Sequence, residues 1–131
     1  MGFAFPKMRE RLPAFSAAVL LGLLWSLWHV PVIDYLGTAT PHGRSWFPFF
    51  LAFTAAMTAM RVLVAWLYSN TGSVPLAQLM HVCSTGSLVI FSPPGVTAAQ
   101  EVFWYALYAA ALWLAIVALI FGAKTFRLSP Q

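Results

Sequence analysis

Hydrophobic residues fill four long stretches of the chain, and short polar segments separate them. The first stretch runs from Leu12 to Ile33, 22 residues without a formal charge. As an α-helix it would be about 33 Å long, enough to cross the hydrocarbon core of a bilayer. The other three cover residues 46–68, 74–90 and 98–121. The pattern predicts an all-α membrane protein, with four transmembrane helices in a single domain that takes in residues 1–131.

The polar segments between these stretches are rich in residues that interrupt helices. They read DYLGTATPHGRS, SNTGS and FSPPGVTAAQ. Glycine and asparagine accept turn conformations, and proline cannot continue a helix. Ser73 is placed to cap the helix that follows SNTGS. We expect His42 to be solvated in the first segment, and Asp34 and Glu101 to lie at the membrane interface, flanking the helices.

Composition excludes a soluble protein. Of the 131 residues 61% are hydrophobic and 8% charged, whereas soluble domains carry about 25% charged residues. The net charge is +4, and its excess lies at the two ends, in Lys7, Arg9, Arg11, Lys124 and Arg127. The positive-inside rule then predicts that both termini are cytoplasmic. The same distribution argues against nucleic-acid binding, and the single cysteine excludes an internal disulfide.

Three ionisable side chains fall inside the predicted spans and are functional candidates, because charge is costly at membrane depth. They are His29, Arg61 and His81. Trp25 precedes His29 by four positions and so shares its helix face. Ser84 and Thr85 follow His81 at i+3 and i+4, on one face with it, where their hydroxyls would hydrogen-bond the imidazole or donate beside it.

Each candidate also has a structural interpretation. Either histidine fits a polar cluster packed between helices. Arg61 lies seven residues before the end of its span, so its long side chain is expected to reach the cytoplasmic surface. The alternative for Arg61 is a contact with a substrate carboxylate or with a buried polar group.

A metal site built from this chain alone is incomplete. A catalytic zinc normally takes three protein ligands, and His29 and His81 are only two. A water-activating site also needs a general base, usually a carboxylate. We expect no carboxylate inside any span, so the missing groups would have to come from outside the chain.

Two segments resemble the CAAX protease and bacteriocin-processing (CPBP) family of intramembrane endopeptidases. They read LLGLLWSLWHVPV and RVLVAWLYSNTGSVPLAQLMH. That family carries a Glu-Glu-x-x-x-Arg motif, then an aromatic residue four positions before a histidine, then a histidine four positions before Asn or a similar polar residue. Trp25 and His29 match the second motif, and His81 with Thr85 matches the third with Thr in place of Asn. The SNTGS turn is also similar, and the resemblance covers roughly residues 2–92.

The resemblance implies an intramembrane metallo-endopeptidase that cleaves prenylated or hydrophobic membrane peptides. His29 would position or activate water, His81 with Thr85 would stabilise the oxyanion, and Trp25, Arg61 and Ser84 would support them. His29 and His81 would be the ligands of a divalent metal such as zinc, if one binds. The glutamate motif is absent, so we expect a C-terminal half of the family domain that is inactive alone.

The resemblance places the chain as a multi-pass protein of a bacterial plasma membrane, in contact with lipid. Two other functions stay open. One is a non-catalytic membrane protein that binds hydrophobic peptides or acts as an immunity-type partner. The other is a b-type haem subunit ligated by His29 and His81, with Gly22 and Gly86 as small residues facing the haem.

Overall fold

The computed structural model describes residues 3–92 and 94–122, and the secondary structure of this part is helical. Its order is a short helix, a long hairpin, and two further long helices. The α-helices are α1 (Ala4–Arg9), α2 (Ala14–Trp28), α3 (Trp46–Thr71), α4 (Val74–Ile90) and α5 (Ala98–Gly122). Two 3₁₀ helices, η1 (Val30–Tyr35) and η2 (Gly43–Ser45), lie between α2 and α3.

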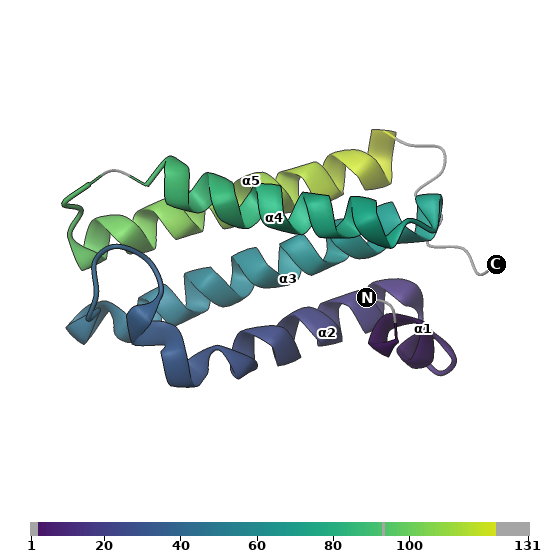
Figure 1. The fold of residues 1–131 in the computed structure, drawn as a ribbon, viewed down its shortest axis with the longest axis horizontal. Helices are drawn as coiled ribbons and strands as arrows, with labels where there is room; N and C mark the ends of the chain where they lie inside the picture. The colour runs from purple at the N-terminus through teal and green to yellow at the C-terminus, as the bar shows by residue number, and fades with distance from the viewer. Residues whose placement is uncertain (1–2, 93, 123–131) are drawn as a thin grey trace.

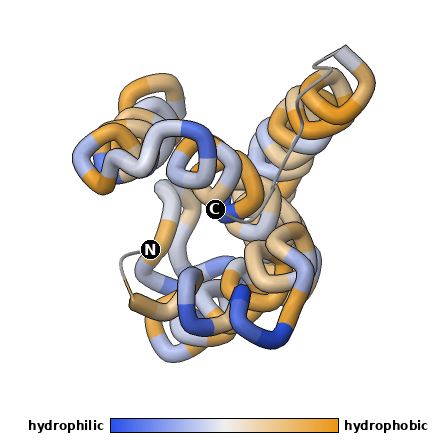
Figure 2. Tube along the Cα trace, turned by 90° about the vertical axis from the view of Figure 1, so that its right-hand side faces the viewer, coloured by the Kyte–Doolittle hydropathy of each residue, from blue (hydrophilic) through white to orange (hydrophobic). Residues whose placement is uncertain are grey.

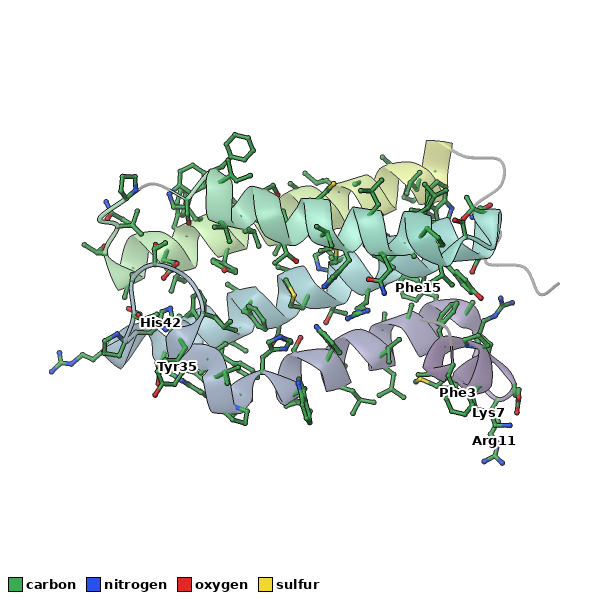
Figure 3. The ribbon with its side chains drawn as sticks, viewed as in Figure 1. Phe3, Lys7, Arg11, Phe15, Tyr35 and His42 are labelled. Atoms are coloured by element: carbon green, nitrogen blue, oxygen red, sulfur yellow. The ribbon has the colours of Figure 1, made fainter. Side chains whose placement is uncertain are left out.

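Helix α3 is the centre of the molecule. It packs against α2, α4 and α5, and it runs antiparallel to α2 (Figure 1). Small and apolar side chains of α3 are fully buried, among them Ala56, Ala59, Val62 and Ala65. The short helix α1 closes one end of α2, where Phe5 is buried and the basic Lys7 and Arg11 extend outward (Figure 3). Every other long helix is therefore positioned through α3.

Hydrophobic side chains cover the outside of the molecule as well as its interior. Figure 2 looks along the bundle and shows hydrophobic residues on outward faces of the helices. Many large ones are well exposed, such as Trp28 at 75% and Val89 at 74%. Within the described residues, α3 (with the preceding η2) and α5 are long and apolar enough to cross a membrane, whereas α2 and α4 are shorter. The all-helical class is as predicted from sequence.

The first predicted span is not one continuous α-helix. α2 ends at Trp28, and the chain continues from Val30 as 3₁₀ helix η1. Pro31 explains the change, because it lacks an N–H and its ring clashes with the carbonyl four residues earlier in an α-helix. The three later helices begin and end within a few residues of the predicted stretches.

The turn between α3 and α4 forms as its residues indicate. Gly72 ends α3 in the left-handed conformation at φ +62°, which costs glycine little. Ser73 caps α4, its side-chain oxygen accepting a hydrogen bond from the backbone N–H of Leu76 at 3.3 Å. The antiparallel reversal of α4 against α3 places His81 back beside the middle of the bundle.

Candidate functional site

A cavity of about 250 Å³ brings together the residues that the motifs singled out, and we call it the histidine cavity. His29 and Trp25 reach it from the end of α2, and His81 and Thr85 from α4. Its remaining wall comes from the loop after η1, from α3, from the end of α4 with Ser92, and from α5. These other lining residues are Leu36, Gly37, Thr38, Phe53, Met57, Leu88, Val89, Ser92 and Tyr105. Two helices remote in sequence thus present both imidazoles to one space.

His29 is held by its own helix. Its Nδ1 lies 2.7 Å from the backbone carbonyl oxygen of Trp25, and its ring packs against the rings of Trp25 and Phe53, each with a centroid separation of 5.4 Å. A carbonyl oxygen only accepts, so Nδ1 carries the proton and donates. In the neutral ring Nε2 is then the atom with the lone pair. The backbone carbonyl four residues earlier therefore sets the tautomer of His29, and the aromatic ring at the same position helps to orient its imidazole.

His81 is less constrained than the sequence suggests. Its Nδ1 is buried and makes no hydrogen bond with the described residues. Ser84, expected beside the imidazole, instead pairs its hydroxyl with that of Tyr108 on α5. Thr85 does line the histidine cavity with His81. Thr85, at i+4, thus lines the cavity together with His81. Ser84, at i+3, instead connects α4 to α5.

Arg61 does not extend toward the nearer end of α3, contrary to the expectation from sequence. Its guanidinium carbon lies 4.3 Å from the centroid of the Trp25 ring. Side chains on an α-helix lean toward its N-terminus, so a residue of α3 leans toward the Trp46 end and not toward Thr71. Arg61 lines a second cavity, of about 220 Å³, that shares Trp25 and His81 with the first. We call it the arginine cavity.

A buried polar cluster fixes the loop that forms one wall of the histidine cavity. Glu101, in the first turn of α5, is 1% exposed and accepts hydrogen bonds from the backbone N–H of Thr38 at 2.6 Å and of Ala39 at 3.0 Å. His42 Nε2 lies 3.2 Å from the same carboxylate, and His42 Nδ1 lies 3.5 Å from Asp34. His42 is at the opposite end of the bundle from Lys7 (Figure 3).

Two expectations about these residues are therefore wrong. His42 is not solvated: it is 2% exposed and stacks on Phe49 with a centroid separation of 3.8 Å. The expectation that no span contains a carboxylate is also wrong, because Glu101 lies in the first turn of α5 and is buried there. The segment DYLGTATPHGRS gives no sequence signal for this cluster, because Glu101, which binds its residues, is about 60 positions later in the chain.

The cluster also limits what Glu101 does. Both of its oxygens are occupied by loop donors, and it does not line the histidine cavity. It is therefore a structural carboxylate and not a base for chemistry at His29. Thr38 and Tyr105 are residues that the motif analysis missed, and they enter the cavity wall through this loop and α5.

The donor set is too small for a metal. Among the described residues no group of three His, Cys, Asp or Glu side chains is placed to hold an ion. Nδ1 of His29 already donates to a carbonyl, which leaves one nitrogen of that ring and those of His81. A zinc ion needs at least a third ligand from elsewhere. Haem also fits poorly, because Gly22 faces α3 and not an open slot: a Cβ there would lie 2.7 Å from Cα of Thr58.

Comparisons with known proteins agree with the motifs. The model of the Rce1-like family of type II CAAX prenyl endopeptidases matches residues 1–87. CAAX prenyl protease 2 of Methanococcus maripaludis is 29% identical over 85 residues, which cover 61% of this chain and 30% of that protein. The chain thus spans less than a third of this relative's length, and no solved structure matches it. By the family match over residues 1–87, the chain belongs to the Rce1-like type II CAAX prenyl endopeptidase family.

Proposed function

We propose that this chain supplies the two-histidine half of an intramembrane endopeptidase site that cleaves hydrophobic or prenylated peptides. One observation carries the proposal: His29 and His81, from α2 and α4, line one cavity together with Thr85. The relative it resembles is named a CAAX prenyl protease, and the family is membrane-embedded. The role of each residue follows from which of its atoms remains available in that cavity.

His29 orients the attacking water. Its Nδ1–H is committed to the Trp25 carbonyl, so Nε2 accepts a hydrogen bond from water in the cavity. His81 and the Thr85 hydroxyl act on the other side of the reacting carbonyl. They donate hydrogen bonds to the oxygen that becomes negatively charged as water adds to the carbon. His81 suits this role because its Nδ1 has no partner among the described residues.

The base that removes the proton from water comes from outside this chain. The sequence has three carboxylate side chains, Glu10, Asp34 and Glu101. Glu10 pairs with Lys7, and the other two pair with His42. None of the three lines the histidine cavity. A glutamate of the Glu-Glu-x-x-x-Arg type, on a separate helix, is the group that would complete the site, with or without a third ligand for zinc.

The apolar wall of the cavity supports a hydrophobic peptide substrate. Phe53, Met57, Leu88 and Val89 lie beside the two imidazoles. A substrate anchored in the membrane by a lipid or by apolar side chains would reach them from the bilayer. All four long helices cross the membrane in this proposal, and the end that carries Lys7 and Arg11 faces the cytoplasm. With these four spans the protein would be a multi-pass protein of a plasma membrane.

A chimeric protease tests the function. Residues 1–131 are joined behind the part of the M. maripaludis protein that precedes its matched segment, and the product is reconstituted in vesicles with a fluorogenic farnesylated peptide. We expect hydrolysis by the chimera and none by this chain alone. His29→Ala and His81→Ala should each lower kcat/KM by about 100-fold or more. The matched control Cys83→Ala should retain activity, because Cys83 is an exposed residue of α4 that does not line the histidine cavity.

Two results would contradict the proposal. One is a monodisperse chimera whose hydrolysis does not change in His29→Ala and His81→Ala. The other is proteolysis by this chain alone that His29→Ala abolishes, because it would show that no further carboxylate is required.

A further inference from the structure

The end of the bundle at α1 carries an excess of positive charge. Lys7, Arg9 and Arg11 lie close together in the chain, and Glu10 is the one acidic residue among residues 3–12. Figure 3 shows Lys7 and Arg11 extending outward from this end. Glu10 pairs with Lys7 at 2.8 Å, in an exposed contact that neutralises one of the positive charges. The two arginines therefore remain as the excess.

Local structure accounts for Arg9 but not for Arg11. Arg9 is half-buried in the last turn of α1, and its guanidinium carbon lies 5.9 Å from the centroid of the Phe5 ring. A cation in the last turn also interacts favourably with the partial negative charge at the end of the helix. Arg11 lies beyond the helix, is exposed, and forms neither an ion pair nor a cation–π contact with any described residue. Its five N–H donors are therefore available to a ligand from outside the chain.

Apolar side chains lie beside these charges. Phe5 is buried and Met8 packs against the core formed by α2, α3 and α5, so one face of α1 is fixed to the bundle. On the outer side Phe3 is 81% exposed, and it extends outward at this end of the bundle (Figure 3). Leu12, at the end of the turn after α1, is exposed as well. Exposed apolar side chains next to cations are typical of segments that lie at a membrane surface.

We propose that residues 3–12 form a docking surface for the headgroup of an anionic phospholipid, and we call it the basic surface. The Arg11 guanidinium pairs with the phosphate oxygens, for which its planar set of donors is suited. Arg9 and Lys7 add positive charge around the headgroup, and Phe3 contacts the acyl chains. The hydrophobic outer faces of the long helices place this end of the bundle beside the lipid headgroups, so a phospholipid is the anion nearest to Arg11. A bound lipid then holds α1 and the start of α2 at the membrane surface.

Native mass spectrometry tests the basic surface in the full chain. The protein is released from detergent micelles that contain equimolar phosphatidylglycerol and phosphatidylcholine with the same acyl chains, and the two species with one bound lipid are compared. We expect phosphatidylglycerol to be bound about 5-fold or more over phosphatidylcholine, since each basic side chain near an anionic lipid contributes a factor of about this size. Arg11→Gln should lower this ratio by about 3-fold or more. Arg11→Lys should retain part of it, because an ammonium group also binds phosphate.

Arg44→Gln is the matched control, because Arg44 is also an exposed arginine outside the α-helices, but lies near His42 at the opposite end of the bundle. It removes the same charge and should leave the ratio unchanged. Equal binding of the two lipids by the parent chain would overturn the proposal. An equal loss in Arg44→Gln and Arg11→Gln would also overturn it, because net charge and not a site would then select the lipid. Binding of an acidic peptide that depends on Arg11, without any preference between the lipids, would overturn the lipid assignment and point to a protein partner.

Discussion

The backbone N–H of Thr38 lies 2.6 Å from the carboxylate of Glu101, a residue 63 positions later in the chain. This contact joins the loop after the first histidine motif to α5, which lies beyond the residues that match the family. Thr38 lines the histidine cavity, so Glu101 sets the shape of one wall without entering it. The hydrogen bonds to Glu101 therefore connect the stability of the loop with the geometry of the candidate site.

Replacing Glu101 by Gln should destabilise the protein. The amide nitrogen of Gln would face one of the two backbone N–H donors that now bind the carboxylate, and leave it unpaired. We expect a loss of about 2–3 kcal/mol in the free energy of unfolding, measured by SDS titration in mixed micelles. Glu10→Gln serves as the control and should change little, since Glu10 forms an exposed pair with Lys7. Equal effects of the two substitutions would show that the buried cluster contributes nothing.

Gly37 is the position in this loop that accepts a side chain least well. Its φ is +85°, and an added Cβ would lie 2.2 Å from Oε1 of Glu101. Gly37→Ala should therefore displace the loop from Glu101, beyond the about 1–2 kcal/mol cost of left-handed backbone. Gly43 has φ +53°, and a Cβ added there would meet open space. Gly43→Ala should therefore lower stability only by the cost of left-handed backbone. The difference between the two unfolding free energies isolates the contact, and similar values would argue against it.

Gly22 permits the close approach of α2 and α3. A Cβ at this position would meet Cα of Thr58 at 2.7 Å, a backbone atom that cannot move alone. Gly22→Ala should separate the helices and lower stability by about 1–3 kcal/mol. It should also weaken the contact between Arg61 and Trp25, which lie on either side of this crossing. Gly86→Ala is the control: its Cβ enters open space, and alanine favours a helix by about 1 kcal/mol over glycine.

Local patterns predicted the helices better than the contacts between them. Residues 74–90 form α4 as predicted, because Pro75, Ser73 and the preceding Gly72 mark its start within a few positions. The resemblance to the CPBP family assigned His29 and His81 to one site, and both line the histidine cavity. The roles of His42 and Glu101 were not recognisable, because a buried hydrogen bond between a loop and a helix 59 positions away leaves no periodic signal. The direction of Arg61 follows from helix geometry, but the partner ring does not.

The remaining prediction concerns how α4, which carries His81, is attached to α5. The hydroxyls of Ser84 and Tyr108 pair between these helices. Ser84→Ala and Tyr108→Phe each remove one partner, and the double variant completes a thermodynamic cycle. We expect a coupling of about 0.6 kcal/mol, the usual size for a hydrogen bond between helices in a membrane, from unfolding in mixed micelles. Because Ser84 lies three residues from His81, both single variants should also loosen the histidine cavity and weaken peptide binding to a similar extent. A coupling of zero would mean that α4 is held by its packing on α3 alone, and that the position of His81 does not depend on α5.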